Sequence, residues 1–190
     1  MKFEITENEA GQRVDKLSRK LLSDVPLGAI YKSIRKGDIR INGKKTKVNN
    51  MVSSGDIFEV KELNFNTKKN DFQKVDSNIK ITFEDDNILI VEKWPGVLVH
   101  SNKQKGNPTL TDYVLSYLFD KGAYKPEKEL IFSPAPCNRL DRNTSGLVIY
   151  GKNAESLRIL NEMVRDRKIK KYYMAFVKGR IKDGKYEAYI

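Results

Sequence analysis

A polar stretch with little apolar periodicity, residues 63–77, divides this chain into two parts. Such a stretch offers few side chains that could join a hydrophobic core, so we interpret it as a linker. It separates residues 1–62 from residues 78–190. A chain of this length suits one large domain or two small ones, and the linker favours two.

The first segment changes from helical to strand periodicity. Four apolar residues recur at helical spacing: Val14, Leu17, Leu21 and Leu22. A second helix is predicted over residues 29–36, ended by Gly37. Alternating apolar residues then flank turn dipeptides, which predicts a hairpin and a further strand. The residues concerned are Ile39, Ile41 and Val48 around Asn42-Gly43, and then Gly55-Asp56 before residues 57–60.

The second segment mixes both periodicities. Strands are predicted over residues 79–84, 88–92, 147–150 and 172–177. Two helical stripes lie between them, and we interpret both as core faces. The stripes are Leu110, Tyr113, Val114, Tyr117 and Leu118, and then Leu157, Leu160, Met163 and Val164. This pattern predicts an α+β domain with a mixed or antiparallel sheet.

The charge balance points to a polyanionic partner. The chain carries 36 Lys and Arg against 25 Asp and Glu, a formal net charge of +11. Ten of these cations and only three acids lie in residues 150–182, beside Tyr172 and Tyr173. Cations next to aromatic rings suit RNA, because they neutralise phosphates and stack on bases. A solvated basic face is the plainer interpretation.

Composition excludes several other classes of protein. Hydrophobic residues make up 39% of the chain, which argues against global disorder. No apolar run approaches the roughly 20 residues that cross a bilayer, and the N-terminus lacks an apolar signal core. The single cysteine, Cys137, excludes an internal disulfide and a cysteine-rich zinc site. We therefore expect a reduced cytoplasmic protein with no membrane partner.

Within the first segment, three blocks resemble an S4 RNA-binding domain: RVDKLSRKLL, IYKSIRKGDIRINGKKTK and VSSGDIFEV. This resemblance implies a small helix-helix-strand module whose second helix and following turn present cations to structured RNA. The positions concerned are Lys32, Arg35, Lys36, Arg40, Lys44 and Lys45. Phosphate contacts of this kind position a protein but do not select a sequence.

Residues 137–153, CNRLDRNTSGLVIYGKN, resemble the signature of the RluA-type pseudouridine synthases, roughly RLDxxTSGLhh. Residues 83–100 resemble the same family's opening strands with its K-P-x-G-h-h-h-H element, although Trp94 stands where proline is usual. KYYMAFVKG, residues 171–179, resembles its K-x-Y-x-A-h-V-x-G block. Asn138 is a further departure, because histidine is common just before the RLD element.

The resemblance implies that a uridine in RNA is detached at its glycosidic bond, rotated and rejoined through C5. The family's motif aspartate corresponds to Asp141, which is the expected catalytic carboxylate. Attack on base or sugar, and removal of a sugar proton, both remain open for it. No atom is gained or lost and nothing is oxidised, so no cofactor and no metal is expected.

The resemblance also assigns roles around Asp141. Arg139 is expected to enter the RNA stack where the target base has left, and Tyr173 to stack on the flipped uracil. A surface salt bridge and a core tyrosine are the respective structural alternatives. Thr144, Ser145 and Gly146 are expected to shape the loop. The basic stretch would add RNA contacts through Arg167, Lys168, Lys170 and Lys171.

The remaining polar residues and the cysteine give weaker indications of function. His100 is expected to be structural or to face RNA, because one histidine cannot build a zinc site. Cys137 is expected to be a small packing residue. Glu84, Asp85 and Asp86 could suggest a metal site, but we interpret them as a solvated strand end.

Family members carry a further G-R-x-H-Q-h-R-like block that does not occur before Ile190. We therefore expect an incomplete catalytic domain. Two functions remain open: an enzyme that isomerises uridines in structured RNA, and a non-catalytic RNA-binding protein that acts through its S4-like module. The expected partner is RNA, first ribosomal and then transfer RNA, and a monomer is expected.

Overall fold

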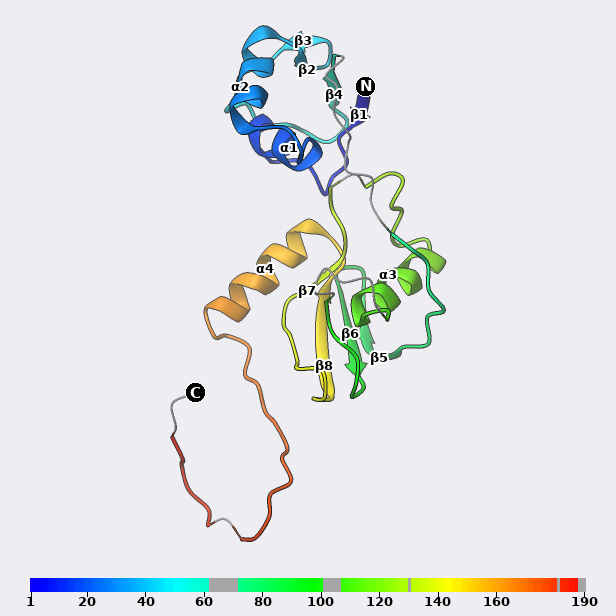
Figure 1. The fold of residues 1–190 in the computed structure, drawn as a ribbon, viewed down its shortest axis with the longest axis vertical. Helices are drawn as coiled ribbons and strands as arrows, with labels where there is room; N and C mark the ends of the chain where they lie inside the picture. Colours follow the sequence, from blue (N-terminus) through cyan, green and yellow to red (C-terminus); the bar gives the residue numbers. More distant parts are fainter. Residues whose placement is uncertain (62–71, 101–106, 130, 181, 188–190) are drawn as a thin grey trace.

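The computed structural model describes residues 1–61, 72–100, 107–129, 131–180 and 182–187. Figure 1 shows an N-terminal module of two helices and short strands next to a second unit built on a sheet. Helices α3 and α4 lie on either side of that sheet in this view. Each unit has its own cluster of buried apolar residues.

The N-terminal module packs two helices beside a four-stranded antiparallel sheet of order β1-β4-β2-β3. Its elements are β1 (Lys2–Glu4), α1 (Val14–Leu21), α2 (Leu27–Lys36), β2 (Ile39–Ile41), β3 (Lys44–Lys45) and β4 (Ile57–Val60). The predicted helices and hairpin are confirmed, whereas β1 was not predicted. Three residues flanked by charges give too short a pattern to signal a strand.

The end of α2 shows why a glycine is needed there. Gly37 has a φ of +83°, the left-handed conformation that glycine adopts without steric cost. The N–H of Asp38 then donates to the Ser33 carbonyl at 2.9 Å, which closes the helix end. A Cβ on Gly37 would also lie 2.5 Å from the Lys45 side chain. The start of α2 lies at Leu27, directly after Pro26, and so precedes the predicted start at residue 29.

The second unit is a four-stranded sheet of order β5-β6-β8-β7. All its described pairings are antiparallel, which settles the choice left open by the sequence. Leu89 and Val91 from β6, with Val148 and Tyr150 from β8, are buried against α3. The elements are β5 (Lys80–Glu84), β6 (Ile88–Lys93), α3 (Leu110–Asp120), β7 (Ala135–Pro136) and β8 (Gly146–Gly151).

Helix α4 (Ala154–Arg165) follows β8 after a tight connection. A Cβ on Gly151 would lie 2.6 Å from the Leu157 backbone, so only glycine allows this approach. Asn153 caps the helix by accepting a hydrogen bond from the Ser156 N–H at 2.8 Å. In the predicted apolar stripe, Leu160 is buried and the other three residues are half-buried. This face is therefore only partly covered.

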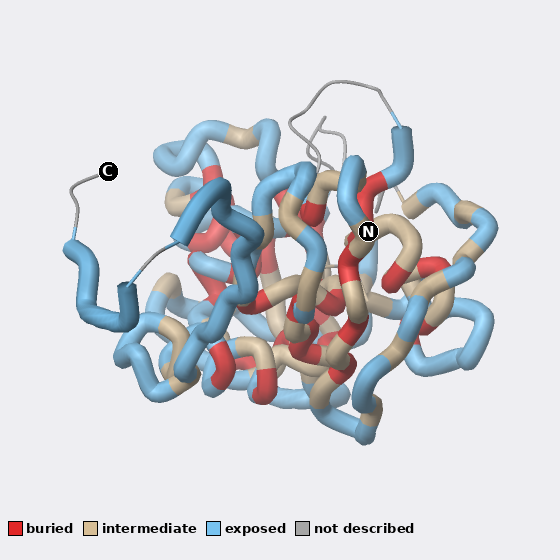
Figure 2. The backbone as a smooth tube through the Cα atoms, turned by 90° about the horizontal axis from the view of Figure 1, so that it is seen from below, coloured by how far each residue is buried: buried red, intermediate tan, exposed pale blue. Residues whose placement is uncertain are grey.

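The strand predicted over residues 172–177 does not form, which corrects the sequence-based expectation. Residues 169–180 have no regular secondary structure, and Phe176 is 99% exposed. Residues 170–180 are all exposed, and Figure 2 shows the C-terminal stretch in the colour of exposed residues. A strand is stable only when a neighbour takes up its backbone hydrogen bonds, and no described strand pairs with this stretch.

The predicted linker is described only from Phe72 onward, because residues 62–71 lie outside the described part of the chain. Phe72 packs its ring 5.2 Å from that of Phe119 and 5.9 Å from that of Tyr124. The N–H of Val75 donates to the Ser116 hydroxyl at 2.9 Å. The end of the predicted linker therefore packs on α3.

The two units meet at a short turn that carries Asn8 and Glu9. Asn8 donates to Glu129 Oε2 at 3.1 Å and accepts from the Ala154 N–H at 2.9 Å. Glu9 is 1% exposed, and it accepts from the Ile131 N–H at 3.0 Å. We call these residues the inter-unit latch: Asn8, Glu9, Glu129, Ile131 and Ala154. It fixes α1 relative to the start of α4.

Candidate active site

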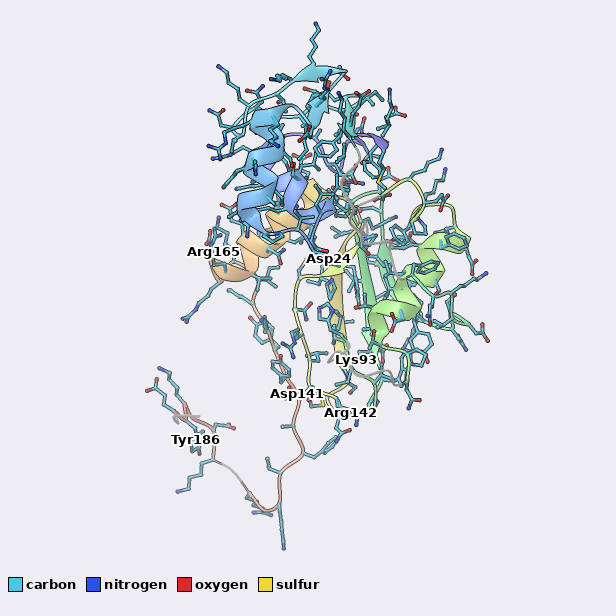
Figure 3. All side chains as sticks on the ribbon, turned by 45° about the horizontal axis from the view of Figure 1, so that its top comes forward. Asp24, Lys93, Asp141, Arg142, Arg165 and Tyr186 are labelled. Carbon is cyan, nitrogen blue, oxygen red and sulfur yellow. The ribbon has the colours of Figure 1, made fainter. Side chains whose placement is uncertain are left out.

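Asp141 lies on an exposed loop between β7 and β8. The loop ends at Gly146, which pairs with Lys93 at the end of β6. Figure 3 shows Asp141, Arg142 and Lys93 close together at this end of the sheet. A carboxylate that stands exposed beside a rigid sheet end can reach a large substrate such as RNA.

Lys93 holds this loop in place through side-chain hydrogen bonds. The sequence patterns had indicated no role for this residue. Its side chain is fully buried, and its Nζ donates to the carbonyls of Trp94 at 3.2 Å, Val97 at 2.9 Å and Arg142 at 2.9 Å. Burial lowers the pKa of the Lys93 ammonium, and the Asp141 carboxylate opposes that shift. One buried cation therefore joins the turn after β6 to the loop of Asp141.

Backbone contacts complete the loop. The N–H of Gly96 donates to the Arg142 carbonyl at 2.8 Å, and the N–H of Thr144 donates to the Asp141 carbonyl at 3.1 Å. Gly146 has a φ of +138°, which side chains disfavour. Thr144 and Gly146 thus take part in the backbone conformation of this loop.

Asn138 pins the start of the loop to β8. Its amide donates to the Leu147 carbonyl at 3.0 Å and accepts from the Ile149 N–H at 2.9 Å. The preceding residue, Cys137, is buried and donates its N–H to the Ile149 carbonyl at 2.8 Å. The side chain of Asn138 thus extends the hydrogen bonding between β7 and β8. Asn138 stands where histidine is common in the family, and here it has a structural role.

Arg139 and His100 are both exposed, and the charge of Arg139 acts on His100. Desolvation lowers the pKa of His100, and the positive charge of Arg139 lowers it further. The Arg139 guanidinium has no ion pair in the described part of the chain. The salt-bridge alternative for Arg139 therefore finds no partner there.

The sequence comparisons decide the family. The sequence model of a family described as RNA pseudouridylate synthase matches residues 87–190, more than half of the chain. The chain belongs to this family. The matched region contains the Asp141 loop, Lys93 and α4, so the site just described lies inside it.

Curated relatives of this pseudouridine synthase family member extend the likeness toward the N-terminus. An uncharacterized RNA pseudouridine synthase from Mycoplasma capricolum is 37% identical over 92% of this chain and 58% of its own length. Ribosomal large subunit pseudouridine synthase C from Escherichia coli is 34% identical over 93% of this chain and 54% of its own length. The chain therefore spans little more than half the length of these relatives.

Tyr173 is not brought to the Asp141 loop by any described contact. Its side chain is 66% exposed, and within the described residues it makes no hydrogen bond or ring contact. The basic residues before it are exposed as well, and Lys168 lies 3.6 Å from Asp166 in a surface ion pair. The pseudouridine synthase signature predicted Asp141 and Arg139 together, and the structure places both on one loop.

The predicted cations of the N-terminal module divide into two groups. Lys32, Arg35 and Lys36 are exposed on α2, and Lys44 and Lys45 are exposed in the hairpin. Arg40 instead donates to the Gly37 carbonyl at 2.9 Å and the Gly43 carbonyl at 3.0 Å. Its guanidinium therefore stabilises the hairpin.

We expected Glu84 to belong to a solvated strand end, but its carboxylate is hydrogen-bonded within the protein. It accepts hydrogen bonds from Tyr117 at 2.7 Å, Lys121 at 2.9 Å and Lys152 at 3.0 Å. Desolvation favours the neutral acid, but these donors prevail and lower the pKa of Glu84 to about 2. Asp85 and Asp86 are exposed. The described residues contain no cluster of three metal-ligating side chains and no helix that could span a membrane.

Proposed function

We propose that this chain isomerises specific uridines to pseudouridine in structured RNA, with Asp141 as the catalytic carboxylate. The observation that carries the proposal is the placement of Asp141 on an exposed loop that buried Lys93 holds in place. Membership of the pseudouridine synthase family supports the reaction. The relatives named for the large ribosomal subunit support ribosomal RNA as the first substrate. We propose transfer RNA as the second.

The reaction breaks the N1–C1′ bond of uridine and forms a C5–C1′ bond after the base has rotated. N1 gains a hydrogen and C5 loses one, so the RNA keeps its composition and oxidation state. Asp141 either attacks the nucleoside or takes a sugar proton, and both roles need a carboxylate within reach of the sugar. We propose the reaction without a cofactor, in the cytoplasm and by a monomer.

Arg139 would occupy the gap left by the flipped base. It lies two residues before Asp141 on the same loop, and it is exposed without an ion pair in the described chain. Flipping a base costs a few kcal/mol, which a side chain in the gap offsets. Tyr173 would stack on the uracil once RNA draws its exposed segment toward the loop. The S4-like module would hold the RNA through the cations of α2 and the hairpin.

The test is tritium release from bacterial large-subunit ribosomal RNA transcribed with uridine labelled at C5. We expect the chain to release tritium, and Asp141→Asn to lower the rate by about 100-fold or more. Asp86→Asn is the matched control, because Asp86 is an exposed carboxylate outside the site. A labelled transfer RNA transcript tests the second substrate in parallel.

The second candidate is a non-catalytic RNA-binding protein, which the exposure of Tyr173 without a described contact to the Asp141 loop favours. It predicts RNA binding that Asp141→Asn leaves unchanged, together with no tritium release by the unaltered chain. That result with both RNAs would contradict the proposed isomerisation.

A further inference from the structure

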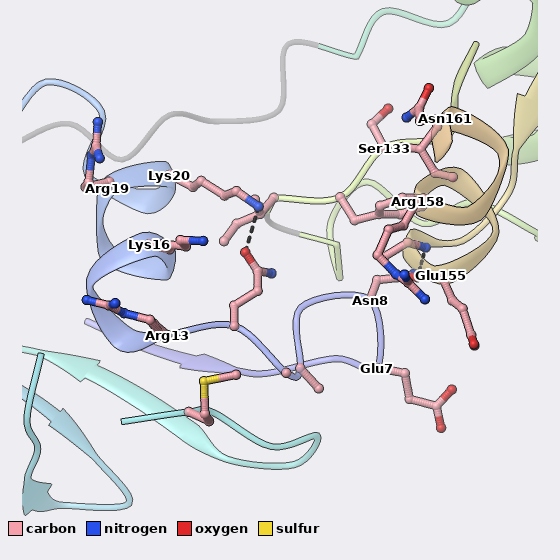
Figure 4. Close-up of a pocket in the computed structure, with 18 residues that line it drawn as sticks. Glu7, Asn8, Arg13, Lys16, Arg19, Lys20, Ser133, Glu155, Arg158 and Asn161 are labelled. Atoms are coloured by element: carbon pink, nitrogen blue, oxygen red, sulfur yellow. Dashed lines mark hydrogen bonds between the residues drawn. The ribbon is translucent and has the colours of Figure 1, made fainter. Parts of the chain in front are cut away.

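A groove of about 1180 Å³ lies between the N-terminal module and α4. It is outside the Asp141 site and contains none of the cations that the S4-like pattern assigned to RNA. Figure 4 shows Lys16 and Lys20 extending from α1 toward the gap, and Arg158 and Asn161 coming from α4 on the other side. Both walls of the groove thus contribute polar side chains.

The cations of this groove are poorly neutralised by the protein itself. Lys16 and Arg19 have no acidic partner in the described part of the chain, and Lys20 donates only to the neutral Gln12 amide at 2.6 Å. Arg158 lies 3.8 Å from Glu162, a long ion pair. Arg13 alone is paired closely, with Asp15 at 2.9 Å. Like charges gathered in this way repel one another, and a bound polyanion would relieve that repulsion.

Acidic side chains occupy a different part of the groove. Glu7 and Glu155 also line it, and Figure 4 shows both extending away from the gap that Lys16 and Lys20 face. The basic part is therefore a separate strip along α1. Lys16 and Lys20 stand one helical turn, roughly 6 Å, apart on the same face of α1. Together with Arg158 on the opposite wall they present several separate cations, which suits a chain of phosphates better than a single anion.

The inter-unit latch holds the two walls at a fixed separation. Asn8 joins the start of α4 to the turn before α1, and the buried carboxylate of Glu9 binds the Ile131 N–H. A groove set by such contacts loses little conformational entropy when it binds a ligand. At its far end, α4 continues into the exposed cations that begin at Arg165.

We propose that this groove binds the phosphodiester backbone of the RNA substrate, through Lys16, Arg19 and Lys20 on α1 and Arg158 on α4. The inference rests on the proposed function for the identity of the substrate. It adds a contact site between the two units, apart from α2 and apart from the Asp141 loop. The groove would align RNA held by the N-terminal module with the sheet that carries Asp141.

The first test measures the salt dependence of binding to large-subunit ribosomal RNA for the full chain. The variant Lys16→Gln, Arg19→Gln, Lys20→Gln removes three groove cations. The control variant Lys2→Gln, Lys74→Gln, Lys80→Gln removes three exposed lysines that lie outside the groove. We expect the groove variant to reduce the slope of log K against log salt by about 2, because each lost phosphate contact removes about 0.7–0.9. A slope equal to that of the control would overturn the proposal.

A second test locates the RNA directly. Asn161→Cys places a reactive thiol on the α4 wall, where a benzophenone maleimide can be attached, because Asn161 is exposed and Cys137 is buried. Lys74→Cys carries the same label next to α3, on the other side of the sheet from α4. We expect RNA crosslinks from position 161 and few from position 74. Equal crosslinking would contradict a groove contact.

Tritium release separates this inference from the proposed function. The groove variant should need a higher RNA concentration for half-maximal release, because it has lost three cations that contact the substrate. If the unaltered chain releases no tritium but the slope and crosslinks behave as expected, isomerisation fails and the groove remains supported. If tritium is released but slope and crosslinks match the controls, the groove fails and isomerisation stands.

Discussion

At the scale of single residues, Lys93 shows that a sequence motif can include a residue without indicating its structural role. The resemblance matched Lys93 to a family position, but nothing local indicated that its ammonium would be fully buried. Its partners include the carbonyl of Arg142, 49 residues along the chain. Side-chain burial depends on which segments meet in space, so sequence spacing gave no signal of this contact. Asp141, in contrast, was predicted from its immediate neighbours alone.

Arg167 carries local backbone strain that gives a prediction. Its φ is +55°, and its N–H and that of Lys168 close the end of α4 on the carbonyls of Val164 at 3.2 Å and Met163 at 2.9 Å. Glycine is favoured at such a position, since a Cβ costs roughly 1 kcal/mol there. We expect Arg167→Gly to slow amide hydrogen exchange at positions 167 and 168 by about five-fold.

The matched control is Lys168→Gly, which removes a neighbouring cation without relieving a positive φ. It should leave exchange at the helix end unchanged or faster. Faster exchange in Arg167→Gly than in the unaltered chain would contradict the interpretation. RNA affinity should fall in both variants if these cations contact phosphates, so stability and binding would change in opposite directions for Arg167→Gly.

At the scale of elements, Glu84 ties β5 to α3 and to the residue after β8. Its pKa of about 2 lies below the usual 4.5, so its contribution to stability is complete above pH 4.5 and is lost as the pH falls toward 2. We expect Glu84→Gln to lower the free energy of unfolding at pH 7 by about 2 kcal/mol, a value that allows for solvent screening. Urea unfolding at pH 7 and pH 3 measures both effects.

The glutamine variant should also lose part of the acid sensitivity, because it has no carboxylate to protonate at this position. Asp86→Asn serves as control and should keep the stability and pH profile of the unaltered chain. A Glu84→Gln variant as acid-sensitive as the unaltered protein would show that other carboxylates dominate acid unfolding.

At the scale of the whole molecule, the latch between the units carries a group that titrates near neutrality. Burial raises the pKa of Glu129 to about 7, and the nearby Glu9 carboxylate adds to the shift. The docked arrangement therefore favours protonated Glu129, so docking is strongest below pH 4.5 and weakens as the pH rises through 7. The strength of docking between the two units is therefore sensitive to pH.

We expect Glu129→Gln to strengthen docking at pH 8 by on the order of 1 kcal/mol, since the carboxyl is only half-buried. Hydrogen exchange of the Ile131 and Ala154 amides, corrected for intrinsic rates, reports docking because both N–H groups donate across the interface. Protection should fall with rising pH in the unaltered chain and stay level in the variant. Glu127→Gln, an exposed neighbour, is the control, and a variant with unchanged pH dependence would contradict the assignment.

The amino-acid sequence by itself determined most helices and strands, and it placed Asp141 and Arg139 on one loop. Those features depend on local periodicity, on turn residues such as Gly37 and on a contiguous motif. The tertiary structure alone decided the antiparallel order of the sheet, the burial of Lys93, the latch at Asn8 and the groove beside α1. It also decided that residues 172–177 stay unpaired. Each of these depends on distant segments meeting, and a strand or a buried cation exists only where distant backbone groups supply its hydrogen bonds.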